Sequence, residues 1–139
     1  MRVTMLLADH AVVADGKLYV NGGGWTLTSP TTPPSSIALK FDVPWDQANT
    51  PIELLLELTD ADGHPVTQPT PVGPAPVHVQ ARLEVGRPPG MPLGAPINAI
   101  VALGIPPLVL DPGQRYTWRL HLDGQTRADW ELTFTTRPE

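Results

Sequence analysis

Apolar and polar residues alternate with a period of two along most of this chain, and this pattern determines its fold class. The clearest case is residues 77–85, where every second residue is apolar: Val77, Val79, Ala81, Leu83 and Val85. A β-strand sends successive side chains to opposite faces, so this run predicts a half-buried strand. Similar runs occupy residues 3–13, 18–21, 37–43, 52–59, 97–103, 116–122 and 128–135. The sequence therefore predicts roughly eight strands.

Turn residues separate these runs. Asp-Gly pairs, which tolerate positive φ at hairpin bends, stand at positions 15–16, 62–63 and 123–124, and Asp-Pro-Gly stands at 111–113. The best helical segment is a single turn over residues 44–49. We therefore predict an all-β, antiparallel β-sandwich of the immunoglobulin-like, C2-like or jelly-roll-like kind. The length of 139 residues suits one domain spanning residues 1–139.

Composition excludes several classes of function. The net charge is −5 and the basic residues are scattered, which argues against a nucleic-acid partner. The chain has no cysteine, so disulfides, thiolate metal sites and cysteine nucleophiles are excluded. No apolar run approaches the length of a membrane-spanning helix, and no signal peptide is recognisable. We expect a soluble, cytoplasmic protein without a cofactor or a membrane partner.

The sequence predicts no catalytic residue. The run from Gly22 to Trp25 follows a short strand, and we interpret it as a tight bend packed under the tryptophan rather than a phosphate-binding loop. His78 and His121 are predicted to point away from the core. If their strands were neighbours, the pair could bind a metal with carboxylates nearby, from Glu84, Asp129 or Glu131. The alternative interpretation is two solvated histidines.

Contact surfaces are the strongest functional signal. Leu55 lies on the polar face of its strand between two glutamates, and Ile100 belongs to a run that is apolar on both faces. Such strands meet either another subunit or a covering loop of the same chain. Two proline-rich stretches, 64–76 and 86–96, must leave the sheets because proline cannot donate to a ladder. The predicted interface residues are Leu55, Ile100, Arg87, Met91 and Leu93.

Two segments resemble an uncharacterised family of small bacterial β-sandwich proteins. The first is the opening run LLADHAVVADGKLYVNGGGW (residues 6–25), which is similar to that family's A-D-x-A-x-V-x-D-G-K-L-x-x-x-G-G motif. The second is PLVLDPGQRYTWRLHLDG (residues 107–124), which resembles its closing hairpin lead-in. The resemblance implies a sandwich and supplies no catalytic residues.

Three functional hypotheses follow. The first is a non-enzymatic binding or protein-interaction module that engages a protein partner or forms a homo-oligomer. The second is a structural component of a larger assembly, such as a phage capsid or tail decoration protein, which would place it in a virion. The third is a metal-dependent hydrolase that uses His78, His121 and nearby carboxylates.

Overall fold

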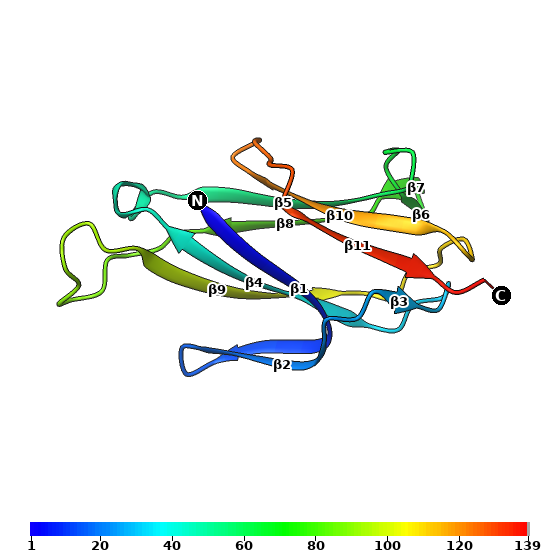
Figure 1. Cartoon of the computed structure of the whole chain (residues 1–139). Helices are drawn as coiled ribbons and strands as arrows, with labels where there is room; N and C mark the ends of the chain where they lie inside the picture. The colour runs from blue at the N-terminus through cyan, green and yellow to red at the C-terminus, as the bar shows by residue number, and fades with distance from the viewer. Residues whose placement is uncertain (139) are drawn as a thin grey trace.

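A computed structural model describes residues 1–138 as two β-sheets packed face to face around one hydrophobic core (Figure 1). One sheet has the order β2-β1-β4-β9 and is made of β1 (Arg2–Ala14), β2 (Lys17–Gly23), β4 (Ser35–Val43) and β9 (Ile97–Ile105). The other has the order β3-β11-β10-β5-β8 and is made of β3 (Leu27–Thr28), β11 (Glu131–Thr136), β10 (Arg115–Leu122), β5 (Ile52–Thr59) and β8 (His78–Leu83). All ladders are antiparallel except the short one between β3 and β11.

The predicted all-β sandwich is confirmed, but the strand count of eight is wrong, because the described residues form eleven strands. The additional ones are short. β3 has two residues, and β6 (Thr67–Thr70) and β7 (Gly73–Pro76) lie in the first proline-rich stretch. None of the three is long or regular enough to produce a visible alternation. The single helical turn predicted at 44–49 is present as a 3-10 turn, η1 (Trp45–Gln47).

Alternating residues of the central strands build the core. On β4 the inward residues are Ile37, Leu39, Phe41 and Val43, and on β5 they are Ile52, Leu54, Leu56 and Leu58. β10 adds Tyr116, Trp118, Leu120 and Leu122, all of them buried. The face assignments made from the period-two pattern are therefore confirmed for these three strands.

The core is less complete along one side of the sandwich. β8 and β9 are edge strands of their sheets, and their inward rows include half-buried residues: Val79, Ala81 and Leu83 on β8, and Ala99, Val101 and Leu103 on β9. Only Ile97 and Ile105, at the two ends of β9, are buried in these rows. Side chains on the central strands, in contrast, are almost fully enclosed. The sandwich therefore leaves part of its apolar interior accessible between these two edges.

The two halves of strand β1 pair with different strands. Residues 2–8 pair with β4, and residues 8–14 pair with β2 through a two-residue turn at Asp15 and Gly16, both with positive φ. This β1–β2 hairpin lies beneath its own sheet in Figure 1, and β2 approaches β9. Ala8, Ser36 and Ala38 belong to the outer face of the sheet, and all three are buried. We attribute this burial to the folded-back hairpin, and the small side chains leave room for it.

The glycine run at the end of β2 makes the tight bend that its composition predicts. Gly22 and Gly24 have positive φ, and the Gly24 amide donates to the Leu7 carbonyl at 2.7 Å. Trp25 then packs edge-on against Phe134 with ring centroids 5.9 Å apart. Its indole N–H is buried without a hydrogen-bond partner among the described residues. The run therefore terminates a hairpin and no helix follows it.

Replacing Gly22 with alanine is expected to destabilise the fold more than the same change at Gly16. Both glycines have positive φ, which alone costs an alanine about 1–2 kcal/mol. A Cβ at Gly16 meets nothing within 4 Å, whereas one at Gly22 would lie 2.7 Å from the Asp9 Cγ. Urea denaturation of both variants measures the difference. Equal losses would contradict the crowding by Asp9, and the double variant D9G/G22A should recover the excess.

The last hairpin differs from its prediction at the turn. Asp123 and Gly124 do form a turn with positive φ, but β11 begins only at Glu131, so residues 123–130 form a longer loop. Ala128 is exposed rather than inward. Trp130 is buried although it precedes the strand, and Arg127 stacks on its ring at 5.2 Å. Loop hydrogen bonds, including one from the Leu120 amide to the Trp130 carbonyl, hold this segment in place.

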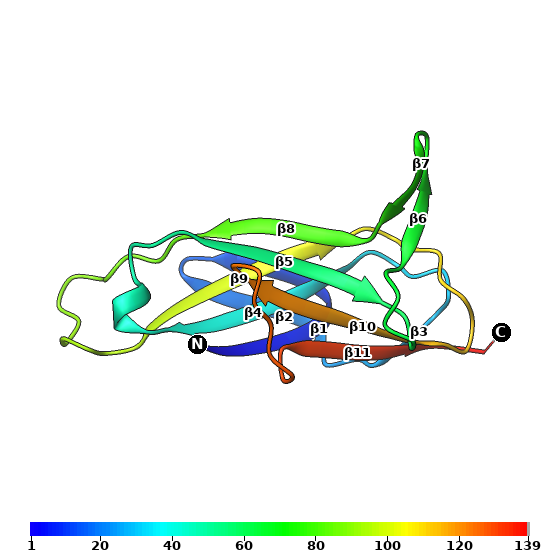
Figure 2. The ribbon, with the colours of Figure 1, turned by 90° about the horizontal axis from the view of Figure 1, so that it is seen from above.

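The two proline-rich stretches leave the sheets as predicted, and they do so differently. The first contains the β6–β7 hairpin, which projects from the sandwich beyond the β8 edge (Figure 2). The Gln68 side chain anchors it, because its amide donates to and accepts from the backbone of Val109 at 2.8 and 2.9 Å. The second stretch, residues 86–96, is a loop without strands. No helix within residues 1–138 is long and apolar enough to cross a membrane.

Candidate binding surface

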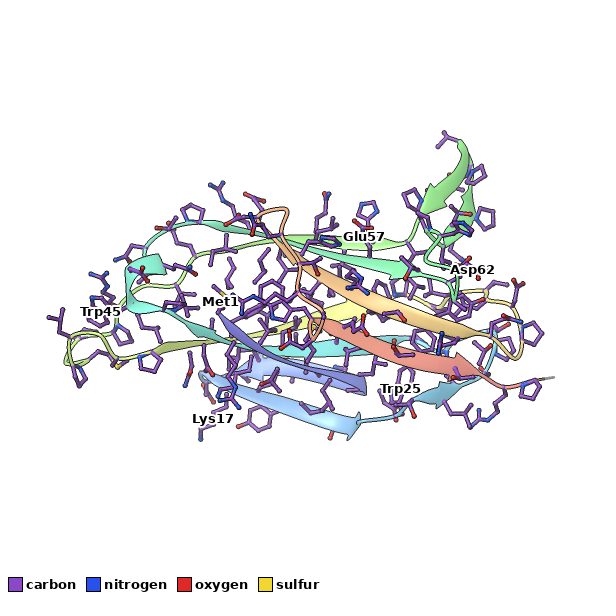
Figure 3. All side chains as sticks on the ribbon, turned by 45° about the horizontal axis from the view of Figure 1, so that its top comes forward. Met1, Lys17, Trp25, Trp45, Glu57 and Asp62 are labelled. Atoms are coloured by element: carbon purple, nitrogen blue, oxygen red, sulfur yellow. The ribbon has the colours of Figure 1, made fainter. Side chains whose placement is uncertain are left out.

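The outer face of the five-stranded sheet gathers most of the polar candidates. Period-two alternation on β8, β5 and β10 sends their second set of side chains away from the core: His78, Gln80 and Arg82; Glu53, Leu55 and Glu57; Thr117, Arg119 and His121. Because β5 lies between β8 and β10, these rows stand side by side. Figure 3 shows Glu57 on this face.

A groove runs across this face above β5. Its larger part has a volume of about 590 Å³ and is lined by residues that include Glu53, Leu55, Gln80, His121 and Gly124. A second hollow of about 250 Å³ shares Leu55, Glu57 and Gln80 with it and continues to the root of the β6–β7 hairpin. The groove therefore extends from the 123–130 loop to that hairpin.

Leu55 occupies the floor of the groove. Its cross-strand neighbours are His121 on β10 and Gln80 on β8, and its side chain is half-buried. The predicted two-sided character of this strand thus corresponds to an apolar patch framed by polar groups. No described segment of the chain covers Leu55 completely, so a partner can still reach it.

The carboxylates along the groove lie close to side-chain nitrogens of neighbouring strands. Glu53 lies 3.5 Å from Arg82, and Glu57 lies 3.7 Å from the Nε2 of His121. Farther along β10, Arg119 donates to Glu131 at 2.6 Å. Exposed pairs of this kind contribute about 0–1 kcal/mol each to stability. Their main effect here is to leave the face balanced in charge and its side chains oriented.

Asp123 holds the end of the groove. Its carboxylate accepts from the Glu53 amide at 2.9 Å, and its own amide donates to the Glu53 carbonyl at 2.8 Å. Asp123 has a φ of 49°, which aspartate tolerates better than most residues. These two hydrogen bonds fix the start of the 123–130 loop to β5.

The structure places the metal candidates His78 and His121 on the same face, on the two strands that flank β5. They are not adjacent, because β5 with Glu57 and Leu55 stands between them. Within residues 1–138 the three-residue group close enough to share an ion is Asp60, Asp62 and His64. There the Asp60 carboxylate already accepts from the amides of Asp62 and His64 at 2.9 Å each, which is a turn-forming role.

The other predicted interface residues do not share a surface with Leu55. Ile100 lies on the opposite sheet, on the outer face of β9, and is half-buried. Arg87 stacks on Trp45 at 4.3 Å and donates to its carbonyl at 2.7 Å, which fixes the start of the 86–96 loop. Leu93 in the same loop is 87% exposed, and Met91 is half-buried. These residues therefore belong to at least three surfaces.

Sequence reasoning missed the exposed apolar residues of the β1–β2 hairpin and the groove itself. Val12, Val13 and Tyr19 are each at least 40% exposed, and the alternation had simply assigned these segments to strands. The groove depends on β8 and β10 both pairing with β5, which no local pattern encodes. Leu55 between two glutamates was the one signal that pointed to it.

Comparison with known protein families shows which family the chain belongs to. A family model described as a family of unknown function, DUF6941, matches residues 3–135. The chain belongs to DUF6941. No curated protein and no solved structure matches it. The resemblance to an uncharacterised family is thereby confirmed at the level of a family of unknown function, and this DUF6941 chain inherits no activity or ligand from it.

Proposed function

We propose that this DUF6941 chain is a non-enzymatic protein-interaction module that holds a segment of a partner protein in the groove above β5. The observation that carries the proposal is Leu55, an apolar floor residue left half-exposed between polar neighbours. An apolar centre with a polar rim is the usual composition of a protein interface. An apolar side chain of the partner would contact Leu55.

The rim supplies hydrogen bonds in both directions. Gln80 offers an amide donor and acceptor, and the imidazole of His121 adds two ring nitrogens that can hydrogen-bond. Backbone groups of an extended partner segment need this mixture, and a groove of about 590 Å³ accommodates a few residues of such a segment. The paired carboxylates Glu53 and Glu57 disfavour a strongly basic or acidic ligand, because neither sign of charge is in excess.

Photo-crosslinking tests the groove. We expect a photoreactive amino acid placed at Gln80 to give one or a few adducts of defined mass in cells of the source organism. The same probe at Thr135, which is exposed on the outer face of β11, is the matched control and should give none of them. Leu55→Arg should abolish the Gln80 adducts while leaving the melting temperature nearly unchanged. Adducts with a different protein, rather than with a second copy of this chain, that survive Leu55→Arg would exclude the groove as the binding site.

The other hypotheses remain predictions. A structural role in a larger assembly would suit the projecting β6–β7 hairpin, and a cytoplasmic location is compatible with a chain that has no cysteine. We also propose that the DGKL-containing opening run is a family motif, because it forms the β1–β2 turn. The metal-hydrolase hypothesis is the weakest, since His78 and His121 are separated by β5.

A further inference from the structure

The free edge of β8 has the properties of a strand that pairs with a second copy of itself. In residues 1–138 this strand has one neighbour, β5, and its inward side chains are only half-buried. The carbonyls of Val77 and Val85 accept from Leu58 and Asn49, so odd-numbered backbone groups point toward β5. The N–H and C=O groups of His78, Gln80 and Arg82 therefore point outward and are available for a new ladder.

We propose that two copies of this chain form a two-fold symmetric dimer by antiparallel pairing of their β8 edges, with Ala81 opposite the partner's Ala81. In this register Gln80 faces the partner's Arg82, and His78 faces the partner's Glu84. Both pairs are complementary in charge or hydrogen bonding. The outward backbone groups of these four positions then form the bonded rungs of the ladder.

Neighbouring registers are unfavourable. A shift by two residues in one direction places Arg82 opposite the partner's Arg82, and a shift in the other direction places Gln80 opposite the partner's Gln80 and loses the pairs of Gln80 with Arg82 and of His78 with Glu84. Like charges directly opposite each other destabilise a sheet. Odd shifts would pair outward backbone groups with inward ones and lose the ladder. The sequence of β8 therefore specifies one register.

The same arrangement extends the apolar core. The half-buried row of Val79, Ala81 and Leu83 would continue into the identical row of the partner, which covers the open side of the sandwich. The two five-stranded sheets would become one continuous sheet. Their grooves above β5 would then lie on a common face, although the proposed groove function does not require the dimer.

The β6–β7 hairpin adds a second contact. It precedes β8 directly and projects beyond the β8 edge (Figure 2). Antiparallel pairing brings the end of the partner's β8, followed by its 86–96 loop, to that position. Val72 at the hairpin tip is 97% exposed and Leu93 in the loop is 87% exposed. Each hairpin therefore flanks the partner's loop, and the two contacts enlarge an interface that six-residue strands alone would leave small.

Single cysteines test the register, because the chain has none of its own. In full-length protein under mild oxidation, Ala81→Cys should crosslink into a covalent dimer, since a residue on the two-fold axis faces its own copy at disulfide distance. His78→Cys is the matched control on the same strand and should not crosslink. Preferential crosslinking of His78→Cys, or of Gly104→Cys on the β9 edge, would overturn the proposed interface.

A second variant separates the dimer from the fold. Gln80→Pro removes an outward N–H that β5 does not use, so it should convert the dimer seen by light scattering into a monomer that still melts cooperatively. Val79→Pro, one residue away, removes an N–H that points toward β5 and should unfold the chain. A wild-type monomer at high concentration, or a dimer that persists in Gln80→Pro, would overturn the proposal without affecting the groove.

Discussion

Replacing Trp118 with alanine is expected to lower the free energy of unfolding by about 3–5 kcal/mol, and Trp130→Ala should do the same. Trp118 is 2% exposed on the central strand β10, and Trp130 is 5% exposed beneath the 123–130 loop. Each substitution removes a large apolar side chain from a site that cannot collapse, because strands or a hydrogen-bonded loop surround it. Urea denaturation measures both losses.

Trp45→Ala is the matched control for these substitutions. The same atoms are removed, but Trp45 is only half-buried and stacks with Arg87 at the end of the sandwich. We expect a loss below about 2 kcal/mol, the size of a partly desolvated cation–π contact with some packing. If Trp118→Ala cost less than about 1 kcal/mol, the inward face of β10 would be assigned wrongly.

Thr136→Val is expected to cost about 2–3 kcal/mol, a loss that hydrophobicity alone would not suggest. Thr136 is fully buried at the end of β11. Its hydroxyl donates to the Asp111 carbonyl at 2.6 Å and accepts from the Gln114 amide at 3.0 Å. Valine has the same shape but leaves both groups without a partner. The hydroxyl thus ties β11 to the turn before β10.

The neighbouring threonine provides the control. Thr135 is exposed on the other face of β11, so Thr135→Val should change stability by no more than about 0.5 kcal/mol. Thermal or urea denaturation of the two variants compares the same chemical change one residue apart. Equal effects would show that the Thr136 hydroxyl contributes nothing through its hydrogen bonds.

Local patterns were sufficient for the main strands and their faces. On β5 and β10 the alternation identified every buried residue, and on β4 it identified the inward row but not Ser36 and Ala38, because a strand with one buried face imposes that period directly. The Asp-Gly turns were also visible, since few other residues accept positive φ. The β6–β7 hairpin was not visible in the sequence, because its prolines suppress the usual strand pattern. The two strands pair nevertheless, with Gln68 opposite Ala75 between the proline positions.

The candidate site was predictable only in part. Leu55 stood out because its apolar side chain breaks the polar row between Glu53 and Glu57. Its neighbours His121 and Gln80 come from strands far away in the sequence, and their positions follow from the order of β8, β5 and β10. The folded-back β1–β2 hairpin was likewise hidden, because the alanines that make room for it carry no pattern of their own.

The sheet order also determines how the chain reaches its native state. Among the described residues, only three ladders join strands that follow each other in the chain: β1–β2, β6–β7 and β10–β11. The central ladders are remote, since Leu39 pairs with Val101 and Leu55 with His121. Long loops must therefore close before most of the apolar side chains are buried. We expect a folding time in the millisecond-to-second range of other β-proteins with high contact order. We expect the local hairpins to form first in that interval, while the edges of β4 and β5 are still open to other chains.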